Sequence, residues 1–394
     1  MKKILLGNRE LIRDINRAIV LNAIKTAGTI SRVDLAEITG LSAATITGIT
    51  AKLIEGGLVF EKSTGDSSGG RPPILLAINP RCGFVIGIKL MEDRAVGSLT
   101  DLNASIESEH TIEFEDKSKD SVVGAILSLV YTLLEKAKLK ADSIFGIGVG
   151  VAGVVDFSLG ILRQNPFFGW ENVNLREILQ SKLRIPVFID NDVNTLTVGE
   201  IWSSAHPAVD DFLVITIGRG IGLGIVINGQ IYRGKSGGAG ELGHIVIDPQ
   251  GPICKCGKRG CLESYLGERA ILVEARKTGR QIETIGCIAE LAEQQEMDLV
   301  NLLSRAGELF GRQVANLVNI FDPKLIVIGG EGVRLGSVFF ENMEKAMRDS
   351  VMPGLAKDTE IRIAHWGDDI WARGAASLVI GEIFKSPIQK EARG

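Results

Sequence analysis

The same order of apolar strands and helices occurs twice along this chain, and this repeat limits the fold more than any other feature. In the first half, three successive strands precede a helix and a longer buried strand, at residues 83–90, 94–102, 105–114, 119–139 and 144–156. A similar succession restarts at 211–231 and is followed by long helices and the buried strand KLIVIGG at 324–330. Two halves of related order predict an α/β protein with two lobes and a cleft between them.

The first 80 residues have a different pattern, in which short helices precede two strands. The predicted helices and strands lie at 9–27, 32–38, 43–55, 58–61 and 74–78. Ser31 and Ser42 are positioned to cap the second and third helices, and Gly40 makes the turn between them. Three helices and a β-hairpin in so short a segment are typical of a winged helix-turn-helix.

Charge is unevenly distributed along the chain. Residues 1–80 hold ten Lys/Arg and seven Asp/Glu, a balance of +3, and because the whole chain carries −4 the remainder carries −7. A mildly basic N-terminal unit on an acidic body fits a DNA-reading head joined to a sensor. We therefore expect a DNA-binding domain at 1–80, a first lobe at 81–190, and a second lobe at 191–394 whose C-terminal helix can return to the first lobe.

The location of the protein is predicted from segments that the sequence lacks. No apolar run reaches the roughly 18 to 20 residues that a membrane helix needs. The N-terminal lysines and short apolar patch are not followed by a small-residue cleavage site. We therefore expect a cytoplasmic protein without membrane association.

The third predicted helix carries small and polar residues opposite its apolar face, as a helix that enters the major groove requires. The residues expected to contact DNA are Ser42, Ala43, Ala44, Thr45, Thr47, Lys52 and Arg71. Ser42 and Lys52 are placed to reach phosphates, and Arg71, held extended by Pro72, suits a narrow A·T-rich minor groove. The alternative is that the small polar residues face water and that GGRPP is a linker.

Three of the five cysteines fall within eight residues, which suits a metal site better than a disulfide framework. With an upstream histidine, the predicted ligands are His244, Cys254, Cys256 and Cys261. Three thiolates and one imidazole complete a tetrahedral shell for Zn²⁺ and leave no position open for water, so one structural ion per chain is expected. Gly257 and Gly260 let the short loop fold around it. A cluster of reduced thiols is the alternative.

Carboxylates and amides gather in glycine-rich turns near this motif: Asp190-Asn191-Asp192 after an apolar strand, Glu241 before His244, and Glu263 just past Cys261. Such side chains hold sugars through paired hydrogen bonds to neighbouring hydroxyls. Singly, each would be read as a solvated residue or a helix cap. Together they indicate a carbohydrate site beside the metal loop.

The motifs GELGHIVID, CKCGKRGCLES, IDNDVN, GVAGVVD, LSAATIT and GGRPP extend over almost the whole chain. In these motifs the sequence resembles the ROK family (repressors, open reading frames and sugar kinases), in its xylose- and N-acetylglucosamine-repressor branch. The resemblance implies an actin-like, ribonuclease H-like, two-lobed sugar-kinase-type domain with sugar in the cleft.

By this resemblance the sugar shell consists of Gly153, Asn165, Asn191, Asp192, Glu241, His244 and Glu263. Asp192 matches the base with which family kinases deprotonate the sugar hydroxyl. His244 belongs to both sets, since its two ring nitrogens can serve zinc and sugar at once.

The sequence departs from the family kinases at the first phosphate loop. These enzymes have Asp-x-Gly-Gly-Thr, whereas this chain has Lys89 in place of the aspartate and Met91-Glu92-Asp93 in place of Gly-Gly-Thr. The acidic side chains would repel phosphate, and the second loop, GRGIGLG, has Arg219 where the kinases usually carry threonine. We therefore predict a degenerate kinase without turnover, with Asp192 as a vestigial base and Lys89 near it in place of magnesium's charge.

These observations predict a repressor of carbohydrate-utilisation genes that binds a palindromic double-stranded operator as a homodimer or a dimer of dimers. Sugar binding would close the cleft and change the spacing of the two DNA heads. One alternative is an active ATP-dependent sugar kinase with a fused DNA-binding head, and another is control by a partner protein docking on the sensor. Xylose, glucose, N-acetylglucosamine and β-glucosides all suit the predicted shell, and either release or tightening of DNA by the sugar is open.

Overall fold

The computed structural model describes residues 9–64, 73–202, 209–367 and 370–385. The chain forms two compact units, of which unit 1 comprises Met1–Pro207 with Trp371–Gly394 and unit 2 comprises Ala208–Ile370. Within the described ranges, no helix combines the length and apolarity needed to cross a bilayer. The domain boundaries expected at residues 80 and 190 stay predictions.

Unit 1 begins with three helices and a small antiparallel sheet of order β1-β3-β2. These elements are α1 (Arg9–Ala27), β1 (Ile30–Ser31), α2 (Arg32–Thr39), α3 (Ala43–Glu55), β2 (Val59–Thr64) and β3 (Ile74–Ile78). The Ser31 and Ser42 side chains accept hydrogen bonds from the N–H groups of Asp34 and Thr45, so both predicted caps are confirmed. Gly40 has the left-handed conformation expected at the turn. This segment is a winged helix-turn-helix and is called the head below.

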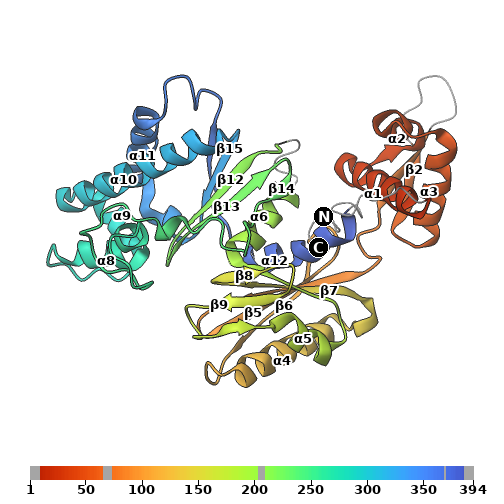
Figure 1. Cartoon of the computed structure of the whole chain (residues 1–394), viewed down its shortest axis with the longest axis horizontal. Coiled ribbons are helices and arrows are strands. Elements are labelled where there is room, and N and C mark those ends of the chain that lie inside the picture. The colour runs from red at the N-terminus through yellow and green to blue at the C-terminus, as the bar shows by residue number, and fades with distance from the viewer. Residues whose placement is uncertain (1–8, 65–72, 203–208, 368–369, 386–394) are drawn as a thin grey trace. The chain divides into compact units, whose positions relative to one another are not determined.

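A five-stranded sheet of order β11-β7-β4-β5-β6 forms the rest of unit 1, with a small sheet of order β10-β9-β8 beside it. The strands are β4 (Phe84–Leu90), β5 (Arg94–Thr100), β6 (Ile106–Glu113), β7 (Ile144–Val151), β8 (Val154–Asp156), β9 (Ile161–Gln164), β10 (Glu171–Val173) and β11 (Val187–Asn191). The helices are α4 (Lys119–Ala137), η1 (Ala141–Ser143), α5 (Leu175–Leu183), α6 (Asp192–Trp202) and α12 (Ile370–Phe384). In Figure 1, α4 and α5 lie on one side of the large sheet and α12 on the other.

The helix α12 is apolar almost all round and is buried along most of its length. Its backbone lies directly on the sheet, because a Cβ atom at Gly87 or Gly148 would come within 1.8 Å of the carbonyl oxygens of Ala372 and Ala375. Only glycine on β4 and β7 permits this approach, so the sequence of the sheet fixes where the C-terminal helix packs.

Unit 2 contains a second five-stranded sheet, of order β14-β13-β12-β15-β16. Its strands are β12 (Phe212–Ile217), β13 (Ile221–Ile227), β14 (Gln230–Ile231), β15 (Leu325–Gly329) and β16 (Glu360–Ile363). Its helices are η2 (Leu242–His244), α7 (Glu263–Leu266), α8 (Glu268–Arg276), α9 (Ile285–Glu293), α10 (Met297–Phe321), η3 (Glu331–Leu335) and α11 (Gly336–Ser350). Phe310 of α10 and Phe339 and Met343 of α11 are fully buried in the core of this unit.

The two large sheets confirm the predicted repeat. In each, three antiparallel strands come first in the chain and two parallel strands are added later on the other side. One local prediction was wrong: residues 144–156 are not a single buried strand. β7 ends at Val151 and β8 starts at Val154, because Gly153 has a φ of 106° that an extended strand does not allow.

Candidate functional site

The unit 1 half of the predicted sugar shell lies at the carboxyl ends of three neighbouring parallel strands. Lys89 on β4, Gly150 on β7 and Asp190 on β11 are level with one another in the sheet register. The chain then leaves β7 and β11 through the turns that carry Gly153 and Asp192. This edge is where open α/β sheets bind ligands, because the strand-to-helix turns converge there.

Lys89 forms an ion pair with Asp192, as predicted. The two side chains are only 12% and 16% exposed, so water screens the pair weakly. The N–H of Val193 donates to the other carboxylate oxygen of Asp192 at 2.9 Å, and the Lys89 Nζ lies 4.3 Å from the ring centroid of Trp371. Both oxygens of the candidate base are therefore engaged without any ligand.

The turn between β4 and β5, which the sequence resemblance aligns with the phosphate loop of the family kinases, is a tight hairpin. The N–H of Met91 donates to the carbonyl of Arg94 at 2.9 Å. The Glu92 and Asp93 side chains are exposed, and Glu92 pairs with Lys117 at 2.9 Å. A turn closed by its own backbone and carrying two carboxylates has no evident means of holding a phosphate.

The two asparagines of the predicted shell mainly hold backbone. Asn165 is buried; its Nδ2 donates to the carbonyl of Ala152 at 2.8 Å, and its Oδ1 accepts from two backbone N–H groups. The Nδ2 of Asn191 donates to the carbonyl of Gly153 at 3.0 Å, while its Oδ1 caps the start of α6. Each Nδ2 retains one further hydrogen, so contact with a sugar stays a prediction for both residues.

The other three residues of the predicted shell belong to unit 2. Glu241 directly precedes η2, His244 ends η2, and Glu263 begins α7. The His244 N–H donates to the Glu241 carbonyl at 3.0 Å. Glu263 is largely buried and accepts a hydrogen bond from the N–H of Ile221 at 3.3 Å. It also forms an ion pair at 3.2 Å with Lys255 of the loop 254–261, which is called the cysteine loop below. The cysteine loop therefore helps to position this carboxylate; whether the three residues bind sugar stays a prediction.

The four predicted metal ligands are brought together, with their donor atoms all within 4.8 Å of one another. The Sγ of Cys254 lies 3.6 Å from the Nδ1 of His244, and the Sγ atoms of Cys256 and Cys261 are 3.6 Å apart. Zinc–sulfur bonds of about 2.3 Å in a tetrahedron place sulfur atoms roughly 3.8 Å apart, so the cluster fits a metal of this size. The Nδ1 of His244 faces the thiols, which leaves its Nε2 for another partner.

Two of the three thiols of this cluster have raised pKa values, whereas the pKa of Cys256 is lowered: burial opposes this shift, and hydrogen bonds from Lys258, Cys254 and Cys261 outweigh it. Burial, followed by hydrogen bonds to Cys256 and Cys254, raises the pKa of Cys261 to about 12. Burial is also the largest cause of the raised pKa of Cys254. Since three crowded thiolates are unfavourable without a counter-charge, the donor set has the chemistry of a site completed by a divalent cation.

The two glycines of the cysteine loop have the predicted role. Gly257 and Gly260 have φ values of 88° and 69°, and a Cβ at Gly260 would lie 1.5 Å from the carbonyl oxygen of Asp248. The Lys258 amino group donates to the His244 carbonyl at 3.0 Å. Backbone conformation and side-chain contacts thus hold the histidine beside the thiols.

The predicted DNA-contacting residues of α3 form an exposed face. Ala43, Ala44, Thr47 and Lys52 are exposed and Thr45 is half-buried, whereas Ile46, Ile49 and Leu53 are buried in the head. Ser42 is exposed while it caps the helix. Arg71 lies outside the described residues. The face has the small, polar character that a major groove accepts, and its contact with DNA stays a prediction.

Two residues of this face were missed from the sequence. Gly48 and Ala51 are exposed beside Ala44 and Thr47, and nothing lies within 4 Å of a Cβ built at Gly48. A glycine in a helix interior costs about 1 kcal/mol relative to alanine, and here packing does not require it. That unexplained cost is a sequence signal that could have added Gly48 to the predicted DNA face.

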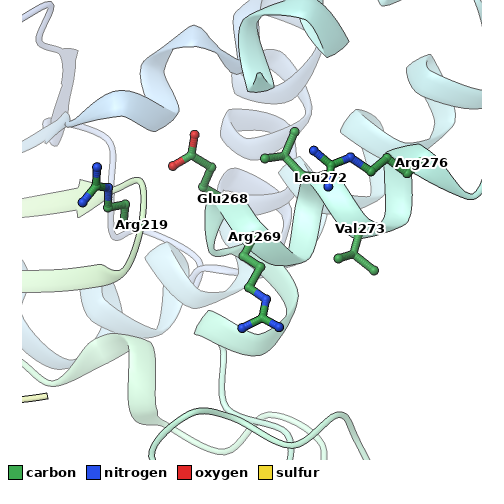
Figure 2. A pocket seen from close by; sticks show the side chains of 6 residues that line it. All are labelled: Arg219, Glu268, Arg269, Leu272, Val273 and Arg276. Atoms are coloured by element: carbon green, nitrogen blue, oxygen red, sulfur yellow. The ribbon is translucent and has the colours of Figure 1, made fainter. Parts of the chain in front are cut away.

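The turn around Arg219, which the sequence resemblance aligns with the second phosphate loop, borders a hollow of about 420 Å³ on the surface of unit 2. The hollow is lined by Arg219, Glu268, Arg269, Leu272, Val273 and Arg276. Figure 2 shows that Leu272 and Arg276 project on one side of α8, and Arg269 and Val273 on the other. The guanidinium groups do not converge on one point, unlike those of a phosphate cradle.

Comparisons with known proteins agree with this division of the chain. The sequence profile of the ROK family matches residues 85–382, and that of winged helix-turn-helix DNA-binding domains matches residues 13–59. The chain is 33% identical over 402 residues to a xylose repressor of Caldicellulosiruptor bescii, which covers 97% of this chain and 99% of that protein. It is 30% identical over 356 residues to the DNA-binding transcriptional dual regulator NagC of Escherichia coli K12, with 88% of each chain covered.

The fold is also that of a solved structure. A crystal structure of a ROK family transcriptional regulator, a homologue of the E. coli MLC protein, superposes with a TM-score of 0.85 at 27% sequence identity. The match covers 97% of this chain and 100% of the other. The head and the two large sheets are therefore features of a known architecture in which a winged helix-turn-helix precedes a sugar-kinase-like domain.

Proposed function

Because the chain belongs to the ROK family and carries a winged helix-turn-helix head, we propose that it is a sugar-responsive transcriptional repressor of carbohydrate-utilisation genes. The relatives that it matches over most of their length are named as repressors or regulators. The observation that carries the proposal is the Lys89–Asp192 ion pair, because it engages the residue that, by the family resemblance, matches the catalytic base of the kinases.

The sugar is proposed to contact residues of both units, each set held by its own turns. These residues are Gly153, Asn165, Asn191 and Asp192 in unit 1, and Glu241, His244 and Glu263 in unit 2. Support comes from the position of the first set at the carboxyl ends of parallel strands and from the tethering of Glu263 to the cysteine loop. Sugar hydroxyls would exchange hydrogen bonds with the carboxylates and the free amide hydrogens.

We propose that the protein does not transfer phosphate. Phosphoryl transfer depends on glycine-lined phosphate turns and on metal held by carboxylates. The β4–β5 turn is instead closed by its own backbone and carries Glu92 and Asp93, and the ammonium of Lys89 neutralises Asp192. Asp192 would then act as a hydrogen-bond acceptor for sugar and not as a base.

The four-residue cluster is proposed to hold one structural Zn²⁺ per chain. The donors would be the Nδ1 of His244 and the Sγ atoms of Cys254, Cys256 and Cys261. The ion would bind the loop that carries Lys255 and thereby keep Glu263 in place. Its role is to order this part of unit 2.

The head is proposed to bind a palindromic double-stranded operator in the cytoplasm, as part of a homodimer or a dimer of dimers. The contacting residues would be Ser42, Ala43, Ala44, Thr45, Thr47, Lys52 and Arg71, with Gly48 and Ala51 on the same face. Two-fold symmetric operators match two-fold symmetric proteins, and heads must lie about one DNA turn apart to use them.

The test combines three measurements on the purified full-length protein. Thermal shift with xylose, glucose, N-acetylglucosamine and a β-glucoside identifies the sugar that raises the Tm most. DNA selected from a random-sequence library gives the operator, and a coupled assay with ATP, Mg²⁺ and the same sugars measures phosphoryl transfer. We expect sugar binding and selection of a palindrome without turnover. Robust turnover with any of these sugars would establish the kinase alternative instead.

A further inference from the structure

Two helices of unit 1 begin beside the Lys89–Asp192 pair and end at the head. The helix α6 starts at Asp192 and ends at Trp202, and α12 starts at Ile370 and ends at Phe384. Both are buried along most of their length, and neither carries a residue of the proposed DNA face. Within unit 1 they therefore connect the region of Asp192 with the head, beside the strands of the large sheet.

The two helices lie in direct backbone contact at glycines. A Cβ at Gly199 of α6 would lie 3.2 Å from the Cα of Gly374 of α12, and a Cβ at Gly374 would lie 2.9 Å from the carbonyl oxygen of Thr195. A Cβ at Gly381 would lie 3.1 Å from the Nε1 of Trp202. At Gly199 and Gly374 no side chain separates the two backbones, so we expect a small shift of one helix to be passed to the other there.

A lysine contacts both helices at each end. At the sugar end, Lys89 pairs with Asp192 of α6 and lies 4.3 Å from the ring centroid of Trp371 of α12. At the head end, the amino group of Lys25 lies 3.1 Å from the ring centroid of Trp202 and 4.5 Å from that of Phe384. Each lysine comes from a third element, β4 or α1, and bridges the pair.

The head-end contact is part of a wider attachment of α1. The Nδ2 of Asn22 donates to the carbonyl of Phe384 at 2.8 Å, and the Trp202 and Phe384 ring centroids are 5.5 Å apart. Val20, Leu21 and Ile24 of α1 belong to the same buried cluster as Ala376, Val379 and Ile380 of α12. The head is therefore packed on the ends of both helices.

We propose that α6 and α12 act as one coupled pair that relays sugar binding at Asp192 to the head, with Lys89 fastening the pair at one end and Lys25 at the other. This inference rests on the function proposed above. A sugar hydroxyl that bonds Asp192 competes with the Lys89 ammonium and loosens its hold on both helices. The displacement changes the spacing of Trp202 and Phe384 around Lys25 and so shifts α1, which carries the head.

The first test needs neither sugar nor DNA. Hydrogen exchange is compared between the wild-type protein and Lys89→Met, with Lys182→Met, an exposed lysine of α5, as the matched control. We expect Lys89→Met to speed amide exchange in α1 around Asn22 and Lys25 as well as at the start of α6, and Lys182→Met to change neither. Faster exchange confined to the sugar end would overturn the inference.

The second test measures the coupling itself, with the selected operator and the panel sugar that raises the Tm most. In the wild type we expect that sugar to change the operator Kd by a factor of about 5 to 150. In Lys25→Met and in Gly199→Ala, which forces α6 and α12 apart, this factor falls to about 2 or less, while each ligand alone still binds. Gly124→Ala, on an exposed position of α4 with open space around it, keeps the wild-type factor.

The outcomes separate this inference from the function on which it rests. If Lys25→Met and Gly199→Ala both keep the wild-type factor, the relay is wrong and the repressor function stands. If the wild type binds DNA and sugar without mutual effect, the proposed function fails, and the hydrogen-exchange comparison still decides whether the two ends of the pair are coupled.

Discussion

At the scale of single residues, the proposal that this chain transfers no phosphate depends on the pair formed by Lys89 and Asp192. Replacing Asp192 by Asn leaves a largely buried ammonium without its counter-charge, which we expect to cost about 2 kcal/mol of unfolding free energy. The double variant Asp192→Asn/Lys89→Met lacks both charges. Its unfolding free energy should therefore exceed the value expected from adding the two single effects by at least about 1 kcal/mol. Urea denaturation measures all three variants.

The exposed pair Arg81–Glu107 is the control for this cycle. The Arg81 side chain is 70% exposed, so Glu107→Gln should cost no more than about 0.5 kcal/mol. A free-energy cost at Asp192 as small as that at Glu107 would mean that the Lys89–Asp192 pair is solvated and does not hold Asp192 in a fixed position.

The metal cluster also makes a prediction at single residues. Protein produced with zinc should carry one Zn²⁺ per chain by elemental analysis, and Cys261→Ser should lose it, because a hydroxyl is a far weaker ligand than a thiolate. A chelator should lower the Tm of the wild type and leave that of Cys261→Ser unchanged. Cys287→Ser, outside the cluster, is the control and should keep its metal.

Equal zinc content in Cys261→Ser and the wild type would contradict the assignment of the four ligands. A wild-type protein that folds fully with no metal would contradict the structural role. Neither result would bear on DNA binding.

Sequence reasoning performed well on residues whose role is local. The cluster of His244, Cys254, Cys256 and Cys261 was visible because three ligands lie within eight residues. The contact of Trp371 with Lys89 was not predictable, since the two residues are distant in the chain and no motif joins them. For the same reason the backbone contacts of Asn165 became visible only in the fold.

At the scale of elements, the sequence predicted the head closely because each helix has its own start and stop signals. The caps at Ser31 and Ser42 and the left-handed Gly40 act within a few residues. The break between β7 and β8 was missed because a continuous apolar run carries no sign of where the chain turns. The packing of α6 on α12 likewise depends on glycines that local patterns do not pair.

Helix α3 provides a prediction that separates stability from DNA binding. Gly48→Ala should raise the unfolding free energy by about 0.8 to 1 kcal/mol, because alanine is the better helix former and its Cβ meets nothing. Gly48→Glu keeps good helix propensity but places a carboxylate on the proposed DNA face, so operator affinity should fall at least about tenfold. Denaturation and fluorescence anisotropy measure the two effects.

Gly124→Ala on α4 is the matched control for this helix, with a similar gain in stability expected and no change in operator affinity. Full operator affinity in Gly48→Glu would show that α3 does not present this face to DNA.

The attachment of α1 to the ends of α6 and α12 gives a pH-dependent prediction. Burial lowers the pKa of Lys25 to about 7 from its ordinary value of 10.5, while the two ring faces favour the charged form. Between these two values the unfolded chain holds a proton that the folded protein has released. The unfolding free energy should therefore rise with pH above about 7, relative to Lys25→Met, and this gain should be absent below pH 7.

Urea denaturation of the wild type and of Lys25→Met at several pH values between about 6 and 9 measures this difference, whose slope cannot exceed about 1.4 kcal/mol per pH unit for one proton. A difference that stays constant over this range would show that the rings keep Lys25 charged and that burial does not decide its protonation.

At the scale of the whole molecule, the chain combines a DNA-reading head with a duplicated sheet topology that family kinases also use. The head and the unit 1 sheet share a buried core that includes residues of α12, so the head belongs to the same compact unit as Asp192. The repeat of strand order made this architecture predictable from sequence. The identity of the sugar was not predictable, because similar carboxylates and amides suit several monosaccharides.

The central claim is that this protein converts sugar binding into a change of DNA affinity and performs no phosphoryl transfer. Fluorescence anisotropy of the selected operator, titrated with the full-length protein with and without each sugar that raises its Tm, tests it most directly. At least one such sugar should change the operator Kd by a factor of about 5 or more. An operator Kd that is the same with every sugar that binds would contradict it.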